Sequence, residues 1–73
     1  MENIIHVFAK IDGSRLVQRG DGLERIHKRK AVAALDAKQV AANGHIDGRV
    51  IFHRVDGTIE VERIYTASIS HHP

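Results

Sequence analysis

The stretch from Arg49 to Tyr65, RVIFHRVDGTIEVERIY, decides the fold, because apolar and polar residues alternate on both sides of a turn. Alternation of this kind is typical of half-buried strands, and Asp-Gly is a favoured centre of a two-residue hairpin loop. A loop of Asp56 and Gly57 predicts three cross-strand pairs: Val55 with Thr58, His53 with Glu60, and Phe52 with Val61.

The two faces of this hairpin differ in composition. One face is apolar with arginines at its edges and is predicted to belong to the core: Val50, Phe52, Arg54, Ile59, Val61 and Arg63. The other face is amphipathic, and we expect it to be either wet or an interface: Ile51, His53, Val55, Glu60, Glu62 and Ile64.

A second hairpin is predicted over residues 4–20, IIHVFAKIDGSRLVQRG, around Asp12 and Gly13. A two-residue loop there pairs Ile11 with Ser14, Ala9 with Leu16, and Phe8 with Val17. Ile5, Val7, Ala9 and Ile11 then share one face, and the opposite face is also apolar: Ile4, His6, Phe8 and Val17. Both sides of this hairpin are therefore expected to be covered.

Residues 20–45 contain a helix whose start has two interpretations. In one, the glycines around Asp21 form a break, Arg25–His27 is extended, and a helix runs from Arg29 to Ala42 and ends at Asn43-Gly44. In the other, Asp21 caps the helix and Glu24 completes a weak capping box.

The helix pattern is apolar on two sides. Ala33, Ala37, Val40 and Ala41 form a stripe small enough to lie close to a sheet, whereas Val32 and Leu35 fall on roughly the other side. Because a helix that is apolar on two sides is usually buried on two sides, we expect a second subunit to cover Val32 and Leu35.

The order strand, strand, helix, strand, strand predicts an α+β fold. Its simplest form is ββαββ, an antiparallel sheet with one helix packed on one face. We expect residues 1–66 to form a single domain and residues 67–73 a flexible C-terminal tail. A domain of 73 residues buries a small core and is often helped by self-association.

Composition excludes several classes of function. There is no cysteine, which rules out disulfides and thiolate sites, and no apolar run resembles a signal peptide or a membrane span. We therefore expect a cytoplasmic protein. The net charge of +2 is weak evidence for a nucleic-acid partner, because such binding depends on clustered charge.

Several short motifs resemble a small bacterial family, domain-of-unknown-function family 2188. Its members show an IHV strand, a VH step before an alanine-rich helix, and VVH-x-x-DG-x-I. The matching residues here are Ile5-His6-Val7, Ile26-His27, the helical alanines at 31, 33, 37 and 41, and His53 to Ile59.

This resemblance covers about Asn3 to Tyr65 and implies a compact domain of two hairpins and a helix, with the helix starting after His27. Two features depart from the family: its second-strand Trp is replaced near Arg15 or Leu16, and its Asp/Thr helix cap is replaced by Lys28-Arg29. The resemblance implies no activity.

A basic cluster is the first candidate site, because positive charge is unusual at a helix N-terminus. Together with the exposed N–H groups of the helix, these cations would suit a phosphate, although charge runs are more often simply solvated. The cluster consists of Arg25, Lys28, Arg29 and Lys30, and Arg15 and Arg19 would extend it if the strands are adjacent.

The remaining chemistry is sparse. His6, His27 and His53 would converge only if their strands are neighbours, and no paired-histidine helix motif is present, so we expect no metal site and no cofactor. No serine has an evident general base near it in the sequence that could activate it as a nucleophile. We interpret Glu60 and Glu62 as solvated charges on an exposed strand face. We therefore expect no catalytic residues and no enzymatic activity.

The sequence thus favours a non-enzymatic binding or adaptor module that acts through a protein surface. We expect a homodimeric accessory protein of bacterial or mobile-element origin. The predicted dimer or partner interface comprises Val32, Leu35, Ile51, His53, Val55 and Ile64. The alternative is a nucleic-acid-binding protein that uses the basic start of the helix.

Overall fold

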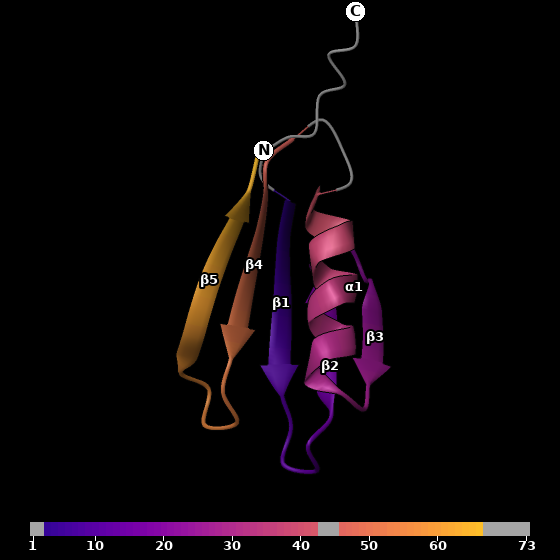
Figure 1. Cartoon of the computed structure of the whole chain (residues 1–73), viewed down its shortest axis with the longest axis vertical. Coiled ribbons are helices and arrows are strands. Elements are labelled where there is room, and N and C mark those ends of the chain that lie inside the picture. The colour runs from indigo at the N-terminus through magenta and orange to yellow at the C-terminus, as the bar shows by residue number, and fades with distance from the viewer. Residues whose placement is uncertain (1–2, 43–45, 67–73) are drawn as a thin grey trace, which may run out of the picture.

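The computed structural model describes residues 3–42 and 46–66, which form five strands and one helix (Figure 1). The elements follow one another along the chain as β1 (Asn3–Ala9), β2 (Arg15–Arg19), β3 (Glu24–His27), α1 (Lys30–Ala42), β4 (Gly48–His53) and β5 (Ile59–Tyr65). All five strands belong to one sheet, so the expected α+β class is confirmed.

The sheet is mixed, and the expected all-antiparallel arrangement is wrong. Its strand order is β3-β2-β1-β4-β5, and the central pair β1 and β4 runs parallel while the other neighbours are antiparallel. In the parallel pair, Ile5 lies beside Val50 and Val7 beside Phe52.

The direction of β4 follows from the elements before it. β1, β2 and β3 form a meander whose two edge strands, β1 and β3, point the same way. The 13 residues of α1 span about 20 Å, close to the length of one strand, so the helix returns the chain to the end where β1 begins. β4 then runs in the direction of β1 and β3, and it pairs in parallel with whichever edge it joins.

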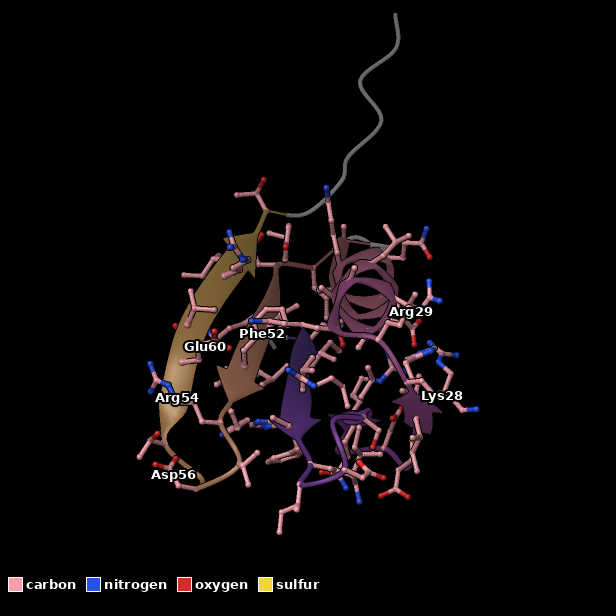
Figure 2. All side chains as sticks on the ribbon, turned by 60° about the horizontal axis from the view of Figure 1, so that its bottom comes forward. Lys28, Arg29, Phe52, Arg54, Asp56 and Glu60 are labelled. Atoms are coloured by element: carbon pink, nitrogen blue, oxygen red, sulfur yellow. The ribbon has the colours of Figure 1, made fainter. Side chains whose placement is uncertain are left out.

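The core lies between one face of the sheet and α1. Ala33, Ala37 and Ala41 are buried on the helix, as the alanine stripe predicts. They pack against five buried side chains of the central strands: Ile5, Val7, Val17, Val50 and Phe52. Figure 2 views the helix nearly end-on, on one side of the sheet, with Phe52 pointing into the same layer.

The helix starts after His27, as the first interpretation predicts, and the alternative with Asp21 as cap is wrong because Glu24–His27 forms β3. Lys30 is the first helical residue, and the carbonyl of Arg29 accepts the first helical hydrogen bond, from the N–H of Ala33 at 3.1 Å. The expected stop at Asn43-Gly44 and the expected tail at 67–73 lie outside the described residues. Within 3–42 and 46–66, no helix has the length and apolar character needed to cross a membrane.

Each of the two predicted hairpins is closed by a three-residue loop instead of the expected two-residue loop. In the first, the N–H of Lys10 donates to the carbonyl of Ser14, which leaves Ile11, Asp12 and Gly13 as the loop. Gly13 has a positive φ of 89°, which glycine adopts without strain, and the carboxylate of Asp12 accepts hydrogen bonds from the N–H and hydroxyl of Ser14. The loops at Gly22 and Gly57 repeat the positive φ and the aspartate bond to the following N–H.

The longer loop shifts the first hairpin by one residue. The observed pairs are Val7 with Val17, Phe8 with Leu16 and Ala9 with Arg15, so the three predicted pairs are wrong. Val17 consequently belongs to the core. Leu16 lies on the opposite face beside Phe8, where Val17 was predicted to lie.

In the second hairpin, a β-bulge shifts the register by one residue from the predicted one. Phe52 pairs with Val61 as predicted, but the register shifts between Phe52 and His53. His53 therefore pairs with Ile59 instead of Glu60, and Arg54 instead of Val55 bonds to Thr58. Ile59 leaves the predicted core face, and Glu60 lies toward the helix, where it accepts a hydrogen bond from Lys30 at 3.0 Å.

Gly48 provides a test of the close approach between helix and sheet. A Cβ at this buried position would overlap the backbone carbonyl of Ala41, so Gly48→Ala should lower the free energy of unfolding by about 2 kcal/mol or more. Urea unfolding followed by circular dichroism measures the change. Gly20→Ala is the matched control, since nothing lies within 4 Å of a Cβ there, and equal stability of the two variants would contradict the packing described.

Candidate interaction surface

The sheet face opposite α1, here called the open face, has no covering layer among the described residues. Its side chains are those that alternate with the core residues along the strands: Ile4, His6, Phe8, Leu16, Gln18, Glu24, Ile26, Arg49, Ile51, His53, Ile59, Glu62 and Ile64. Most of these are apolar or aromatic, which is unusual for a sheet face in contact with water.

One row of side chains crosses all five strands of the open face. The registers align five residues side by side, from β3 to β5: Ile26, Leu16, Phe8, His53 and Ile59. The two ends of the row are well exposed, Ile26 at 64% and Ile59 at 55%, and the three central side chains are half-buried by their neighbours. The row is therefore a band of apolar side chains with one imidazole, that of His53, and no other element of the described residues covers it.

The next two rows combine apolar and polar groups. Glu24, Gln18, His6, Ile51 and Glu62 form one, and Ile4, Arg49 and Ile64 form the other. The Nε of Arg49 lies 3.6 Å from a carboxylate oxygen of Glu62, so these two charges compensate each other. Glu24 accepts a hydrogen bond at 2.8 Å from the neutral amide of Gln18 and keeps its negative charge. The open face thus carries two carboxylates and one guanidinium.

Three rings form a cluster at the centre of the open face. The Nδ1 of His6 lies 2.9 Å from the Nε2 of His53, a hydrogen bond between two imidazoles. Phe8 stacks on His53 with ring centroids 4.5 Å apart, and on His6 at 5.6 Å. Burial lowers the pKa of His6, and the nearby His53 lowers it further, because a second positive charge is disfavoured there.

The structure divides the predicted interface residues between two sides of the domain. Ile51, His53 and Ile64 lie on the open face, and Val55 lies in the β4–β5 loop. Val32 and Leu35 are exposed on the side of α1 that faces away from the sheet, at 47% and 56%. One flat contact cannot include both groups, so the predicted single interface becomes two separate surfaces.

His53 is the one member of the apolar row that the sequence predicted as an interface residue. Phe8 was placed on the correct face but not in the interface, and the other three members were missed: Leu16, Ile26 and Ile59. Leu16 and Ile59 were placed on the other face because the loops were assumed to hold two residues. The recurrence of Asp-Gly before Ser14, Leu23 and Thr58 was the available signal, since it repeats one loop type three times.

The basic cluster is largely paired within the chain. The guanidinium of Arg25 donates to both oxygens of Asp36, at 2.8 and 2.7 Å, and that of Arg19 bonds to Asp21 at 2.9 Å. Lys30 pairs with Glu60 at 3.0 Å, and Arg15 donates to the carbonyl of Gly13. The six predicted cations therefore do not form one open patch.

Lys28 and Arg29 are the two members of the cluster with no side-chain partner among residues 3–42 and 46–66. Both are exposed, and Figure 2 shows them pointing outward at the β3 edge, on the far side of the domain from Arg54 and Asp56. They lie next to the first turn of α1, which contains no acidic residue.

The histidines converge only in part. His6 and His53 meet on the open face, whereas His27 lies on the helix face and bonds to Asp36 at 2.8 Å. Within the described part of the chain, no group of three potential ligands is arranged to hold a metal ion.

Comparison with protein-family models, with curated proteins and with solved structures finds no match for this chain. The resemblance to domain-of-unknown-function family 2188 stays a prediction, and function is argued from the geometry of the surfaces alone.

Asp36 offers a test of the ion pairs that attach α1 to β3. Burial alone would raise the pKa of Asp36, but the hydrogen bonds from Arg25 and His27 outweigh it and hold the pKa below its ordinary value of 3.8. The stabilisation is thus present above pH 3.8 and is lost as the pH falls below it. Asp36→Asn should cost about 1 kcal/mol near neutral pH, a value reduced because Arg25 is half exposed.

Urea unfolding at neutral and acidic pH measures this contribution, with Lys38→Gln as an exposed control on the same helix. The difference between Asp36→Asn and the unmodified chain should shrink below pH 3.8. A difference that grows in acid would contradict the assignment.

Proposed function

We propose that the protein is a non-enzymatic binding module that forms a homodimer through the open face of its sheet. The observation that carries this proposal is the apolar row from Ile26 to Ile59, which crosses every strand and is not covered by any other element of residues 3–42 and 46–66. Burial of such a row is the main favourable contribution that a chain of this size gains by self-association.

The occupant we propose is a second copy of this chain. Strands about 4.8 Å apart with residues about 3.3 Å apart give the sheet a footprint of roughly 500 Å², so two open faces remove roughly 1,000 Å² from water. That total reaches the lower limit of a specific interface. On the open face of each copy Arg49 pairs with Glu62, and the one uncompensated charge is that of Glu24, which is exposed on the edge strand β3. Repulsion between two identical faces is therefore limited to this one carboxylate of each copy.

The dimer can be tested by adding charge to the ends of the apolar row. Ile26→Glu with Ile59→Glu should leave the monomer folded, since both side chains are more than half exposed, and should raise the dissociation constant roughly a hundredfold or more, because each charge would be buried on association. Sedimentation equilibrium measures the constant.

Leu35→Glu is the matched control, at 56% exposure on the opposite side of the domain. It should leave the dimer intact. Loss of the dimer in Leu35→Glu alone would move the contact to the outer side of α1, and a monomer at high micromolar concentration would sink the proposal altogether.

The alternative function is nucleic-acid binding at the start of α1, and the observation that favours it is the exposed pair Lys28 and Arg29. These two cations, which have no side-chain partner within the described part of the chain, and the N–H groups of the first helical turn can contact a phosphate, but they form a small contact area. Arg15, Arg19, Arg25 and Lys30 would have to exchange their present partners for phosphates to enlarge it.

Fluorescence anisotropy with labelled DNA and RNA at increasing salt tests this alternative. Binding through phosphates should weaken steeply with salt, and Lys28→Glu with Arg29→Glu should abolish it. If the double variant binds as the unmodified chain does, or if no binding occurs at low salt, the alternative fails.

A further inference from the structure

The imidazole pair of His6 and His53 occupies the centre of the surface proposed for self-association. Their nitrogens are 2.9 Å apart, so one ring donates an N–H while the other accepts through an unprotonated nitrogen. The hydrogen bond survives with no proton added or with one. It cannot survive when both rings are protonated, because two N–H groups would then face each other.

No side chain next to the pair on the open face carries a negative charge that would stabilise a protonated imidazole, and only the ring face of Phe8 attracts a cation. On the open face, Gln18 of β2 and Ile51 of β4 lie beside His6, and Ile59 of β5 lies beside His53. Within β1 the nearest neighbours on this face are Ile4 and Phe8. None of these five side chains carries a charge.

The charged groups of the same face are already engaged. Glu62 of β5 pairs with Arg49 of β4, and Glu24 of β3 accepts a hydrogen bond from Gln18. The hydrogen bonds among the described residues give neither imidazole a carboxylate partner, in contrast to His27, which bonds to Asp36. If a second copy covered the open face, water would be removed from the pair. A protonated pair would then lose the solvation that water provides.

We propose that the His6–His53 pair makes self-association pH-dependent, so that two copies join at neutral pH and separate in mild acid. This inference rests on the proposed dimer and adds its regulation. It assigns the pair a role in control, while the apolar row supplies the attraction.

The direction of the pKa shift of His6 agrees with a dimer that is weaker in acid. Burial and the neighbouring His53 lower the pKa of His6 below its ordinary value of 6.5 in the single chain, and further burial in a dimer acts in the same direction. A base whose pKa falls on association releases protons as the dimer forms. The dimer is therefore favoured at neutral pH and weakens once the pH falls below the pKa of His6 in the single chain, which itself lies below 6.5.

The size of the effect follows from the number of protons released. A two-fold dimer contains two such pairs, and each proton released per dimer changes the dissociation constant by up to tenfold per pH unit. Release of one proton from each pair would raise the constant by up to roughly a hundredfold per pH unit below the lowered pKa of His6.

Sedimentation equilibrium at about pH 7.5 and about pH 5 tests the proposal, since the pKa of His6 lies below the ordinary histidine value of 6.5. The unmodified chain should lose dimer affinity at the lower pH, by up to about tenfold for each proton released and each pH unit below the pKa of His6. His6→Phe with His53→Phe keeps two rings beside Phe8 but removes the titration, and its affinity should be the same at both values. His27→Gln, on the helix face, should behave as the unmodified chain does.

Each outcome has a separate meaning. If the unmodified chain is monomeric at both pH values, the proposed dimer fails. If it is equally dimeric at both, the dimer stands and the pH control is wrong. Circular dichroism at each pH reports the fold, and a dimer that is lost only together with the fold, or a double phenylalanine variant that keeps the full pH dependence, overturns the role of the pair.

Discussion

The packing of a single alanine-lined helix against one face of the sheet is the constraint on which the rest of the structure depends. Ala33, Ala37 and Ala41 bring α1 close to the central strands, and Gly48 allows the same closeness at the helix end. The described residues contain no second helix to cover the other face. Because that face is lined by isoleucine, leucine and aromatic side chains, the fold leaves an apolar surface that association would bury.

Much of the fold could be predicted from the sequence, and what could not was decided by geometry beyond single elements. Alternation predicted the strands, and the alanine stripe predicted the buried side of α1. The parallel pairing of β1 and β4 could be predicted only by following the direction of the chain through each element. In a three-stranded meander both edge strands point the same way, and the helix then brings the chain back so that β4 runs in that direction too. The loops were misjudged because Asp-Gly suits both two-residue and three-residue turns, and only the hydrogen bond from Lys10 to Ser14 distinguishes them.

The candidate site was less predictable, because a register error of one residue moves a side chain to the opposite face. Leu16 and Ile59 changed faces in this way. The basic cluster was misjudged for a different reason. Its cations are close together in the sequence, but two of their partners, Asp36 and Glu60, come from distant positions in the chain. The sequence alone therefore overestimated the exposed positive charge. His6 and His53 form a hydrogen bond because β1 and β4 are adjacent strands, and this adjacency cannot be predicted from composition.

The central claim is that the open face is the surface through which this protein associates. Isoleucine methyl groups report on it directly, since Ile4, Ile26, Ile51, Ile59 and Ile64 lie on that face, whereas Ile5 is in the core and Ile11 is at a loop. In methyl NMR spectra recorded on dilution, we predict that resonances of the first five shift and those of Ile5 and Ile11 do not. Shifts confined to the methyl groups of Val32 and Leu35 would contradict the account.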